Sequence, residues 1–375
     1  MQTLTVIPVG HDPRMPLVET CARKRADVRL LSAESFFNTV PAAKEDGFSS
    51  LLFVVAVDAF GVGEDFIRTV RGIRALDSDA LKGCAAGVVL LGSTELDTKN
   101  AARELIFALD TAGCAFPEKP LVEATGSMKN LRVIMRTQAL AAPTDALAFS
   151  VGGLLDRLLS FAPVRYANPR LLVLHASDRP TSNTLALGDL VLDALDARFS
   201  VKTLSLRNGT IEDCRGCPYV VCSHFANKGS CFYGGSISQE VIPAVQECEA
   251  LLLLLPNYND AVGANVTAFF NRLTGLHVSG GLTGQRLYAV VVSGYSGGDL
   301  VAKQAMGALC LNRSFLLPPH FCLLETANDP GEAVRLPGVR LRAAAFAAQL
   351  ARQLLQTPFT TDAAATESED ARYYE

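Results

Sequence analysis

The chain carries no excess of positive charge and no long apolar run. Its 34 Lys and Arg residues against 38 Asp and Glu residues give a formal net charge of −4, which offers no basic surface for nucleic acid. The longest apolar run, residues 250–256, is far shorter than the ~20 residues that a membrane-spanning helix needs. The amino terminus lacks the basic and apolar regions of a signal peptide. We therefore expect a cytoplasmic protein that binds neither nucleic acid nor membranes.

Two glycine-rich phosphate-binding motifs are also missing. The sequence contains neither the Gly-x-Gly-x-x-Gly of dinucleotide-binding folds nor the Gly-Lys-Ser/Thr of nucleotide triphosphatases. No catalytic acid or base stands out among the five histidines. The catalytic residues therefore stay unknown, and any phosphate site must use a different kind of turn.

Short apolar runs alternate with stretches of helical period along the whole chain. This alternation is typical of βαβ units and of a parallel sheet covered on both faces. A length of 375 residues exceeds the ~250 to 300 residues of a single core. We expect two tandem doubly wound α/β domains at 1–165 and 166–356, followed by a disordered acidic tail at 357–375.

The second half repeats features of the first in the same order. The Asp-Ala-x-Gly of residues 58–61, which follows an apolar run, recurs at residues 260–263. Leu-x-Gly at residues 81–83 likewise recurs at 282–284, and each copy precedes another apolar run. We interpret the chain as an internal duplication whose first half is degenerate.

A turn rich in hydroxyl groups separates the first apolar run of the second half from an amphipathic helix. A helix amino terminus presents unpaired N–H groups and a positive dipole end, which favour a bound phosphate. Hydroxyl groups and one fixed positive charge are available beside it, and helix capping by these residues is the structural alternative. The candidate phosphate ligands are Ser177, Arg179, Ser182, Asn183 and Thr184.

Three turns of the second half together indicate a family. Ser-x-Arg-x-x-Ser-Asn-Thr, Pro-x-Tyr and Ser-Gly-x-x-Gly-Gly follow its first, third and fourth expected strands. This pattern resembles the NADPH-dependent FMN reductase and iron–sulfur flavoprotein branch of the flavodoxin-like superfamily. The resemblance implies FMN in the second domain, NADPH or NADH as co-substrate, and a homodimer. It implies that the isoalloxazine ring and ribityl chain contact Pro256, Asn257, Tyr258, Asn259, Ser293, Gly294, Tyr295, Gly297 and Gly298.

The first half has lost these turns. Residues 10–14 lack the Ser-Asn-Thr cap, residues 57–60 lack the Pro-x-Tyr, and Glu95 places a carboxylate where an electron-rich flavin would be repelled. We expect the first domain to hold no cofactor and to pack against the second domain or to form an oligomer surface.

Four cysteines lie within an insertion of the second half, residues 213–235. Cys214, Cys217, Cys222 and Cys231 have the spacing Cys-x2-Cys-x4-Cys-x8-Cys, which departs from the compact spacing of cluster-bearing relatives. Four thiolates can ligate a [4Fe–4S] cluster, zinc is a second option, and a thiol pair, Cys214 and Cys217, near the flavin or a structural role are further options.

The sequence thus predicts a flavoprotein oxidoreductase that uses FMN to pass electrons from NAD(P)H to a small acceptor or a partner protein. The flavin itself can accept hydride, so a catalytic side chain is not required. The alternatives are an electron carrier or thiol redox sensor without steady turnover, and a structural tandem domain with vestigial sites.

Overall fold

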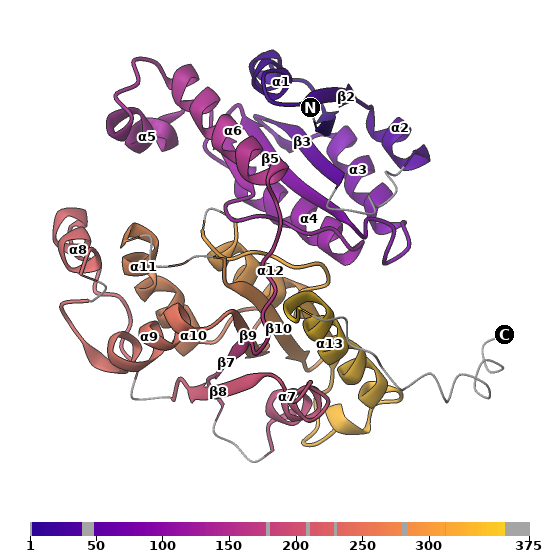
Figure 1. Cartoon of the computed structure of the whole chain (residues 1–375), viewed down its shortest axis with the longest axis vertical. Helices are drawn as coiled ribbons and strands as arrows, with labels where there is room; N and C mark the ends of the chain where they lie inside the picture. The colour runs from indigo at the N-terminus through magenta and orange to yellow at the C-terminus, as the bar shows by residue number, and fades with distance from the viewer. Residues whose placement is uncertain are drawn as a thin grey trace.

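The chain folds into two α/β domains, each built around one parallel sheet (Figure 1). The computed structural model describes residues 2–39, 49–177, 181–207, 211–228, 231–279, 282, 284–311 and 313–356. The predicted tail at 357–375 lies outside these residues. Within them, no helix is both long enough and apolar enough to cross a membrane.

The first domain contains β1 (Thr3–Val9), α1 (Met15–Arg23), β2 (Asp27–Leu30), α2 (Ala33–Asn38), β3 (Ser49–Asp58), β4 (Gly61–Val62), α3 (Glu64–Arg74), β5 (Cys84–Gly92), α4 (Thr98–Thr111), β6 (Leu121–Ala124), η1 (Lys129–Leu131), α5 (Arg132–Thr137) and α6 (Pro143–Leu159). Its sheet has the order β2-β1-β3-β5-β6, and the short β4 pairs antiparallel with β3.

The second domain contains β7 (Arg170–His175), α7 (Asn183–Asp193), β8 (Ser200–Ser205), α8 (Tyr219–Ala226), η2 (Ile237–Val241), α9 (Ile242–Glu247), β9 (Ala250–Pro256), α10 (Ala264–Arg272), α11 (Thr274–Ser279), β10 (Arg286–Ser293), α12 (Gly298–Leu309), β11 (Cys322–Thr326), η3 (Ala333–Arg335) and α13 (Val339–Leu354). Its sheet order is β11-β10-β9-β7-β8.

Both sheets have the strand order 2-1-3-4-5 of flavodoxin-like folds once β4 is set aside. The central strands form because they are apolar along most of their length: every residue of β5 is buried, as is every residue of β10. A strand buried on both faces requires helices on both sides. The predicted pair of tandem doubly wound domains is therefore confirmed.

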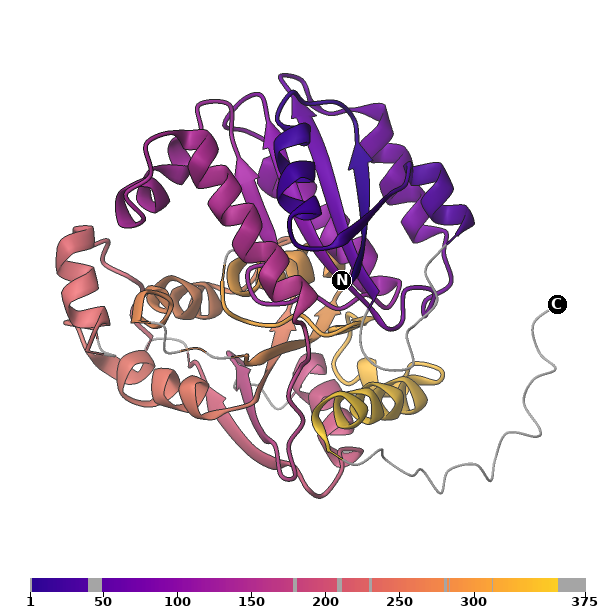
Figure 2. The same cartoon turned by 45° about the horizontal axis from the view of Figure 1, so that its top comes forward.

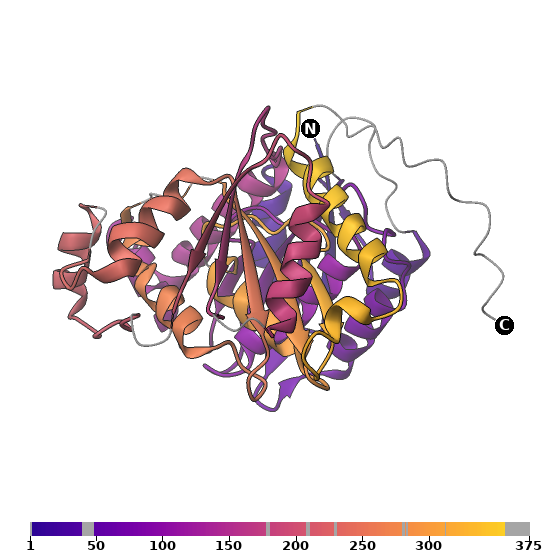
Figure 3. The ribbon, with the colours of Figure 1, turned by 90° about the horizontal axis from the view of Figure 1, so that it is seen from below.

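Helices cover both faces of each sheet. In the second domain α7 and α13 pack on one face, whereas α9, α10 and α12 pack on the other (Figure 3). In the first domain α1 and α6 share one face, and α2, α3 and α4 cover the other. The faces that carry α4 and α12 belong to one continuous buried cluster. The two domains therefore share a core, and they lie directly against each other in Figure 2.

The contact between the domains has an internal two-fold character. Ala85 forms a parallel β-bridge with Ala115 in the first half, and Arg286 forms one with Leu316 in the second half. The two bridges are equivalent, and corresponding residues lie 201 positions apart in the sequence. Phe116 and its counterpart Leu317 bond to each other: each N–H donates to the other's carbonyl oxygen, at 2.9 and 3.2 Å. A residue that contacts its own counterpart lies on a two-fold axis. This arrangement supports the interpretation of a duplication.

One motif that suggested the duplication does not occupy equivalent positions. The tight turn after β3 is closed by Asp58 and Gly61, and the one after β9 by Tyr258 and Ala261, a separation of 200 residues. The Asp-Ala-x-Gly motifs at 58–61 and 260–263 lie 202 residues apart, two more than the turns themselves. The motifs therefore do not occupy equivalent positions in the two domains. The Leu-x-Gly match holds, because Gly83 and Gly284 lie 201 residues apart with nearly equal φ angles of 77° and 78°.

A carboxyl group is fully buried where the domains meet. Asp110, in α4, accepts a hydrogen bond from the N–H of Phe321 at 3.2 Å, whereas its Oδ2 has no partner. Burial raises the pKa of Asp110 well above its usual value, and the Phe321 bond only partly offsets this. The folded chain therefore favours the protonated acid.

We expect Asp110→Asn to stabilise the protein at neutral and higher pH. A raised folded-state pKa means that Asp110 contributes full stability below the unfolded-state pKa of ~3.9 and loses it as pH rises toward the folded-state pKa. Asparagine removes this loss, so urea unfolding at pH 8 should show a gain of about 1 kcal/mol or more. The exposed Asp193→Asn variant is the control, and equal stability of both variants would contradict the expectation.

Candidate functional site

The candidate site lies at the carboxyl edge of the second sheet, where four strands end close together. β7, β8, β9 and β10 end at His175, Ser205, Pro256 and Ser293. The strand order reverses between β7 and β9, and ligands of doubly wound sheets bind in the crevice at such a point. The three predicted turns follow β7, β9 and β10, so the fold brings them to one edge.

The turn after β9 is a tight hairpin that presents a tyrosine. Tyr258 pairs with Ala261, and the two residues between them, Asn259 and Asp260, have φ angles of 53° and 58°. Asn and Asp tolerate this left-handed conformation better than other side chains. The ring of Tyr258 is exposed at the edge of the site. Pro256, as the last residue of β9, fixes where the turn begins.

Asn257 ties the turns after β9 and β10 together. Its amide Nδ2 lies 2.8 Å from the carbonyl oxygen of Ser296 and 3.3 Å from both Ser293 Oγ and Asp260 Oδ1. Ser293 itself is buried. The two turns are therefore held in a fixed relation by one side chain.

The turn after β10 depends on glycine. Gly297 has φ 81°, and a Cβ there would stand 2.1 Å from Asp260 Oδ1 and 3.0 Å from Asn257 Nδ2. A Cβ on Gly298 would meet Ser293 Oγ at 3.0 Å, and one on Gly294 would meet Asn328 Oδ1 at 3.0 Å. Tyr295 projects its ring into solvent. The turn thus requires glycine at these positions, because a side chain would clash with the neighbouring groups of the protein itself.

The same turn spells Gly-x-Ser-x-Gly between a strand and a helix, which is the pattern of a hydrolase nucleophile elbow. Ser296 is absent from the residues with positive φ, and Gly297 is the residue of this turn that has it. The strained backbone that presents a nucleophile is therefore not found at Ser296.

The candidate phosphate ligands have different surroundings in the structure. Ser182 caps α7 by accepting a hydrogen bond from Leu185 N–H at 3.3 Å, and Thr184 is buried. Ser177 is half-buried after β7, whereas Arg179 lies outside the described residues. The amide of Asn183 donates to Ala327 and Asp329 carbonyls and accepts from Ala333 N–H. Its side chain thus holds the neighbouring segment 327–333.

Three buried polar atoms without hydrogen-bond partners lie at this edge. They are His175 Nδ1, Ser205 Oγ and Asn257 Oδ1, each at or next to the carboxyl end of a strand. Burial lowers the pKa of His175; the Ser177 backbone and the charge of Asp189 oppose this shift, and the charge of Arg207 adds to it. Buried polar atoms normally have partners. At the edge where the three turns meet, these atoms fit a polar ligand such as FMN.

The sequence did not single out His175 or Ser205. The available signal was their position, because each is the last residue of a strand and strand ends form this edge. Arg207, just beyond β8, is a further cation near the turn.

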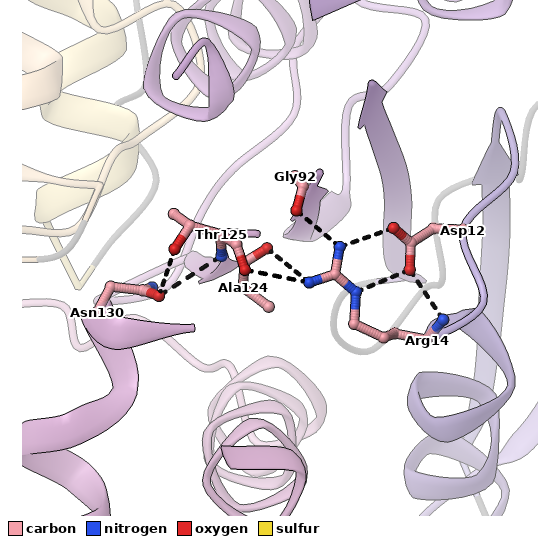
Figure 4. Close-up of polar contacts among 6 residues, drawn as sticks. All are labelled: Asp12, Arg14, Gly92, Ala124, Thr125 and Asn130. Atoms are coloured by element: carbon pink, nitrogen blue, oxygen red, sulfur yellow. Dashed lines mark hydrogen bonds and ion pairs between the residues drawn. The ribbon is translucent and has the colours of Figure 1, made fainter. Parts of the chain in front are cut away.

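The equivalent edge of the first domain is filled by an arginine (Figure 4). Arg14 precedes α1 as Ser182 precedes α7. Its guanidinium donates to the carbonyl of Gly92 at 2.8 Å and to those of Ala124 and Thr125 at 3.2 Å. Asp12 accepts from the same group at 2.7 Å. Burial alone would raise the pKa of Asp12, but Arg14 lowers it. This ion pair therefore ties the ends of β5 and β6 to the start of α1.

The four clustered cysteines border one cavity of about 220 Å³. Its walls include Phe225, Phe232 and Arg272, the last residue of α10. The turn after β9 adjoins the first residue of the same helix, and a helix of this length is roughly 13 Å long. The cysteines therefore lie together, but at the other end of α10 from the three turns.

The cavity does not present a ready metal site. Among the described residues, no three His, Cys, Asp or Glu side chains are grouped so that they could hold a metal ion. Burial raises the pKa of Cys222, and the nearby Cys214, Cys217 and Cys231 raise it further. The thiols are therefore close enough to interact, but this geometry does not fit a bound iron–sulfur cluster or zinc.

Arg272 fastens the cysteine insertion to α10. It is buried and donates to the carbonyls of Gly234 and Glu212 and to Ser238 Oγ, the last at 2.8 Å.

We expect Arg272→Met to lower the free energy of unfolding by about 2 kcal/mol, because buried acceptors lose their donor. All four cysteines should then react faster with a thiol reagent. The exposed Lys202→Met serves as control, and unchanged labelling rates would contradict this assignment.

Comparisons with known proteins give a family match for the second domain. Residues 169–329 match the model of the NADPH-dependent FMN reductase family. No curated protein sequence matches the chain significantly. The solved structures that resemble it include the Trp repressor binding protein of Bacillus subtilis, at 14% identity and a TM-score of 0.32, covering 50% of this chain and 98% of that one.

Two further structures have similar values. The NAD(P)H:quinone oxidoreductase of Methanothermobacter marburgensis has 15% identity, a TM-score of 0.35 and coverage of 50% and 96%. The FMN-dependent NADH-azoreductase of Bacillus anthracis str. Ames Ancestor, in complex with FMN, has 13% identity, a TM-score of 0.32 and coverage of 48% and 99%. The part of the chain that carries the three turns, residues 169–329, thus matches the NADPH-dependent FMN reductase family, which confirms that part of the resemblance and leaves the iron–sulfur flavoprotein branch a prediction.

Proposed function

We propose that the protein is an oxidoreductase that binds one FMN at the carboxyl edge of the second sheet and transfers electrons from NADPH or NADH to a small acceptor. The observation that carries this proposal is the convergence of three turns with the orphaned atoms of His175, Ser205 and Asn257. The family match of residues 169–329 supports it. We propose the cytoplasm as its location.

The proposed roles follow from the geometry of the site. Ser177, Ser182 and the N–H groups at the start of α7 would bind the phosphate, with Arg179 and Arg207 as cations. The turn that contains glycines 294, 297 and 298 would lie against the ring, beside the exposed rings of Tyr258 and Tyr295. Bound FMN would supply hydride acceptance and electron transfer. Asn257 would hold the two turns at a fixed spacing.

The proposal is tested by titrating purified protein with FMN and then mixing the complex anaerobically with NADPH or NADH. We expect saturable binding with one FMN per chain, bleaching of the flavin absorbance by the nicotinamide, and continued nicotinamide oxidation once a quinone is added. Absence of FMN binding would overturn the proposal. Reduction without turnover on any acceptor would favour an electron carrier or redox sensor instead.

The cysteines and the assembly state are separate questions. Because the described geometry does not fit a metal, we assign the cluster no step in electron transfer, and iron analysis of anaerobically purified protein tests this directly. The homodimer stays a prediction. The two-fold contact around Phe116 and Leu317 already pairs two domains of one fold within a single chain.

A further inference from the structure

Lys303 connects the first domain to the predicted flavin turn. Its Nζ lies 2.9 Å from Oδ2 of Asp299 in the first turn of α12, and 2.7 Å from Oε1 of Glu104 in α4 of the first domain. The side chain is only 7% exposed. The ammonium also stands 5.3 Å from the centre of the Phe107 ring, within cation–π range. One nearly buried charge thus contacts both domains.

Lys303 belongs to a row of four side chains with alternating charge. Glu104 forms a second ion pair, with Arg74 in α3, at 2.7 Å. The order is Arg74, Glu104, Lys303 and Asp299, and the first two belong to the first domain. Arg74 and Asp299 are each about half exposed, so water screens the ends of the row more than its centre. Lys303 is therefore the member whose charge is least screened.

Asp299 places a negative charge beside the turn proposed to bind the flavin. It directly follows Gly297 and Gly298. Partial burial alone would raise the pKa of Asp299, but the hydrogen bond and charge of Lys303 lower it, so the carboxylate is ionised. Asp260, in the turn after β9, is exposed to water. A reduced flavin carries more negative charge than an oxidised one, so an unpaired Asp299 would oppose its binding.

We propose that Lys303 is a positioning residue through which the first domain tunes the flavin turn. Held by Glu104 and Phe107, it neutralises Asp299 and allows the site to bind reduced FMN. This inference rests on the proposed function, since it requires FMN at the carboxyl edge of the second sheet. It also gives the first domain a role although its own edge is filled by Arg14.

A purely structural role makes a different prediction. Lysine four residues after aspartate is an ordinary helix pair, and a bridge between domains contributes to stability. If Lys303 only braces the domains, its loss lowers the melting temperature and weakens oxidised and reduced FMN equally. If it neutralises Asp299, the loss weakens reduced FMN more.

The experiment measures the dissociation constants of oxidised FMN and of dithionite-reduced FMN anaerobically, together with the melting temperature of each apoprotein. For Lys303→Met we expect reduced FMN to be weakened about tenfold more than oxidised FMN, the effect of one unit charge ~10 Å away at an effective dielectric of ~20. Lys303→Arg should keep the wild-type ratio of the dissociation constants of reduced and oxidised FMN. The double variant Lys303→Met/Asp299→Asn should return this ratio to the wild-type value.

Asp299→Asn alone keeps the buried lysine and tests the idea without relying on Lys303→Met to fold. In this variant the ratio of the two dissociation constants should change in the opposite direction to that of Lys303→Met, so that reduced FMN binds more tightly. Unchanged ratios in Lys303→Met and Asp299→Asn, with FMN still bound, would overturn the role of Lys303. A wild-type protein that binds neither form of FMN would instead overturn the proposed function.

Discussion

Replacing Gly297 by alanine should weaken FMN binding by about two orders of magnitude, about 2.8 kcal/mol, and leave the fold intact. The new Cβ would stand 2.1 Å from Asp260 Oδ1 and 3.0 Å from Asn257 Nδ2. Either the carboxylate or the amide must move. Because Asn257 links the turns after β9 and β10, its displacement changes the surface on which the flavin ring would lie. Fluorescence titration with FMN measures the loss.

Gly338 offers a matched control for the effect on the backbone. It precedes α13 with φ 67° and ψ 5°, close to the 81° and 8° of Gly297 before α12. A Cβ on Gly338 would meet only the flexible end of the Arg342 side chain, at 3.2 Å. Alanine in the left-handed region costs about 1 to 2 kcal/mol at either position. Both variants should therefore lose similar stability, whereas Gly338→Ala should bind FMN normally. Equal FMN affinity in the two variants would show that Gly297 has no special part in binding.

The sequence predicted the architecture because buried parallel strands leave a strong signal. β5 and β9 are continuous apolar runs, and their spacing along the chain indicates βαβ units. The location of the site followed from topology, since turns after successive parallel strands meet at one edge. The turns after β9 and β10 could thus be assigned to one site without knowledge of any contact.

Contacts between distant segments were not predictable in the same way. Asn183 was predicted to be a phosphate ligand, but its amide bonds residues 327–333, more than 140 positions away. A thiol pair of Cys214 and Cys217 near the flavin was one of the options for the cysteines, but the insertion lies at the far end of α10, where Arg272 holds it. The pairing of Lys303 with Glu104 depends on how α4 meets α12, and neither helix carries a local pattern that specifies its partner.

The two domains should unfold in a single transition, and a cavity at their contact should destabilise both. Phe321, in the second domain, is fully buried and packs edge-on against Phe107 of α4 at 6.3 Å between ring centres. Phe321→Ala should cost about 3 to 5 kcal/mol. Hydrogen exchange in increasing urea can follow β3 and β9 separately in one sample. We expect both strands to lose protection at the same, lower urea concentration. Phe149→Ala, on the exposed face of α6, should leave both midpoints near the wild-type value.

The shared core makes the same measurement sensitive to the ligand. Because FMN is expected to bind only the folded second domain, a saturating concentration adds stability to whichever cooperative unit contains that domain. If the buried cluster that joins α4 and α12 makes the chain one unit, FMN should raise the unfolding midpoint of β3 as much as that of β9, although β3 lies in the domain whose own edge is closed by Arg14. At a hundredfold excess over the dissociation constant the gain is about 2.7 kcal/mol. A midpoint that rises at β9 alone would mean that the domains unfold independently and that their contact transmits no stability.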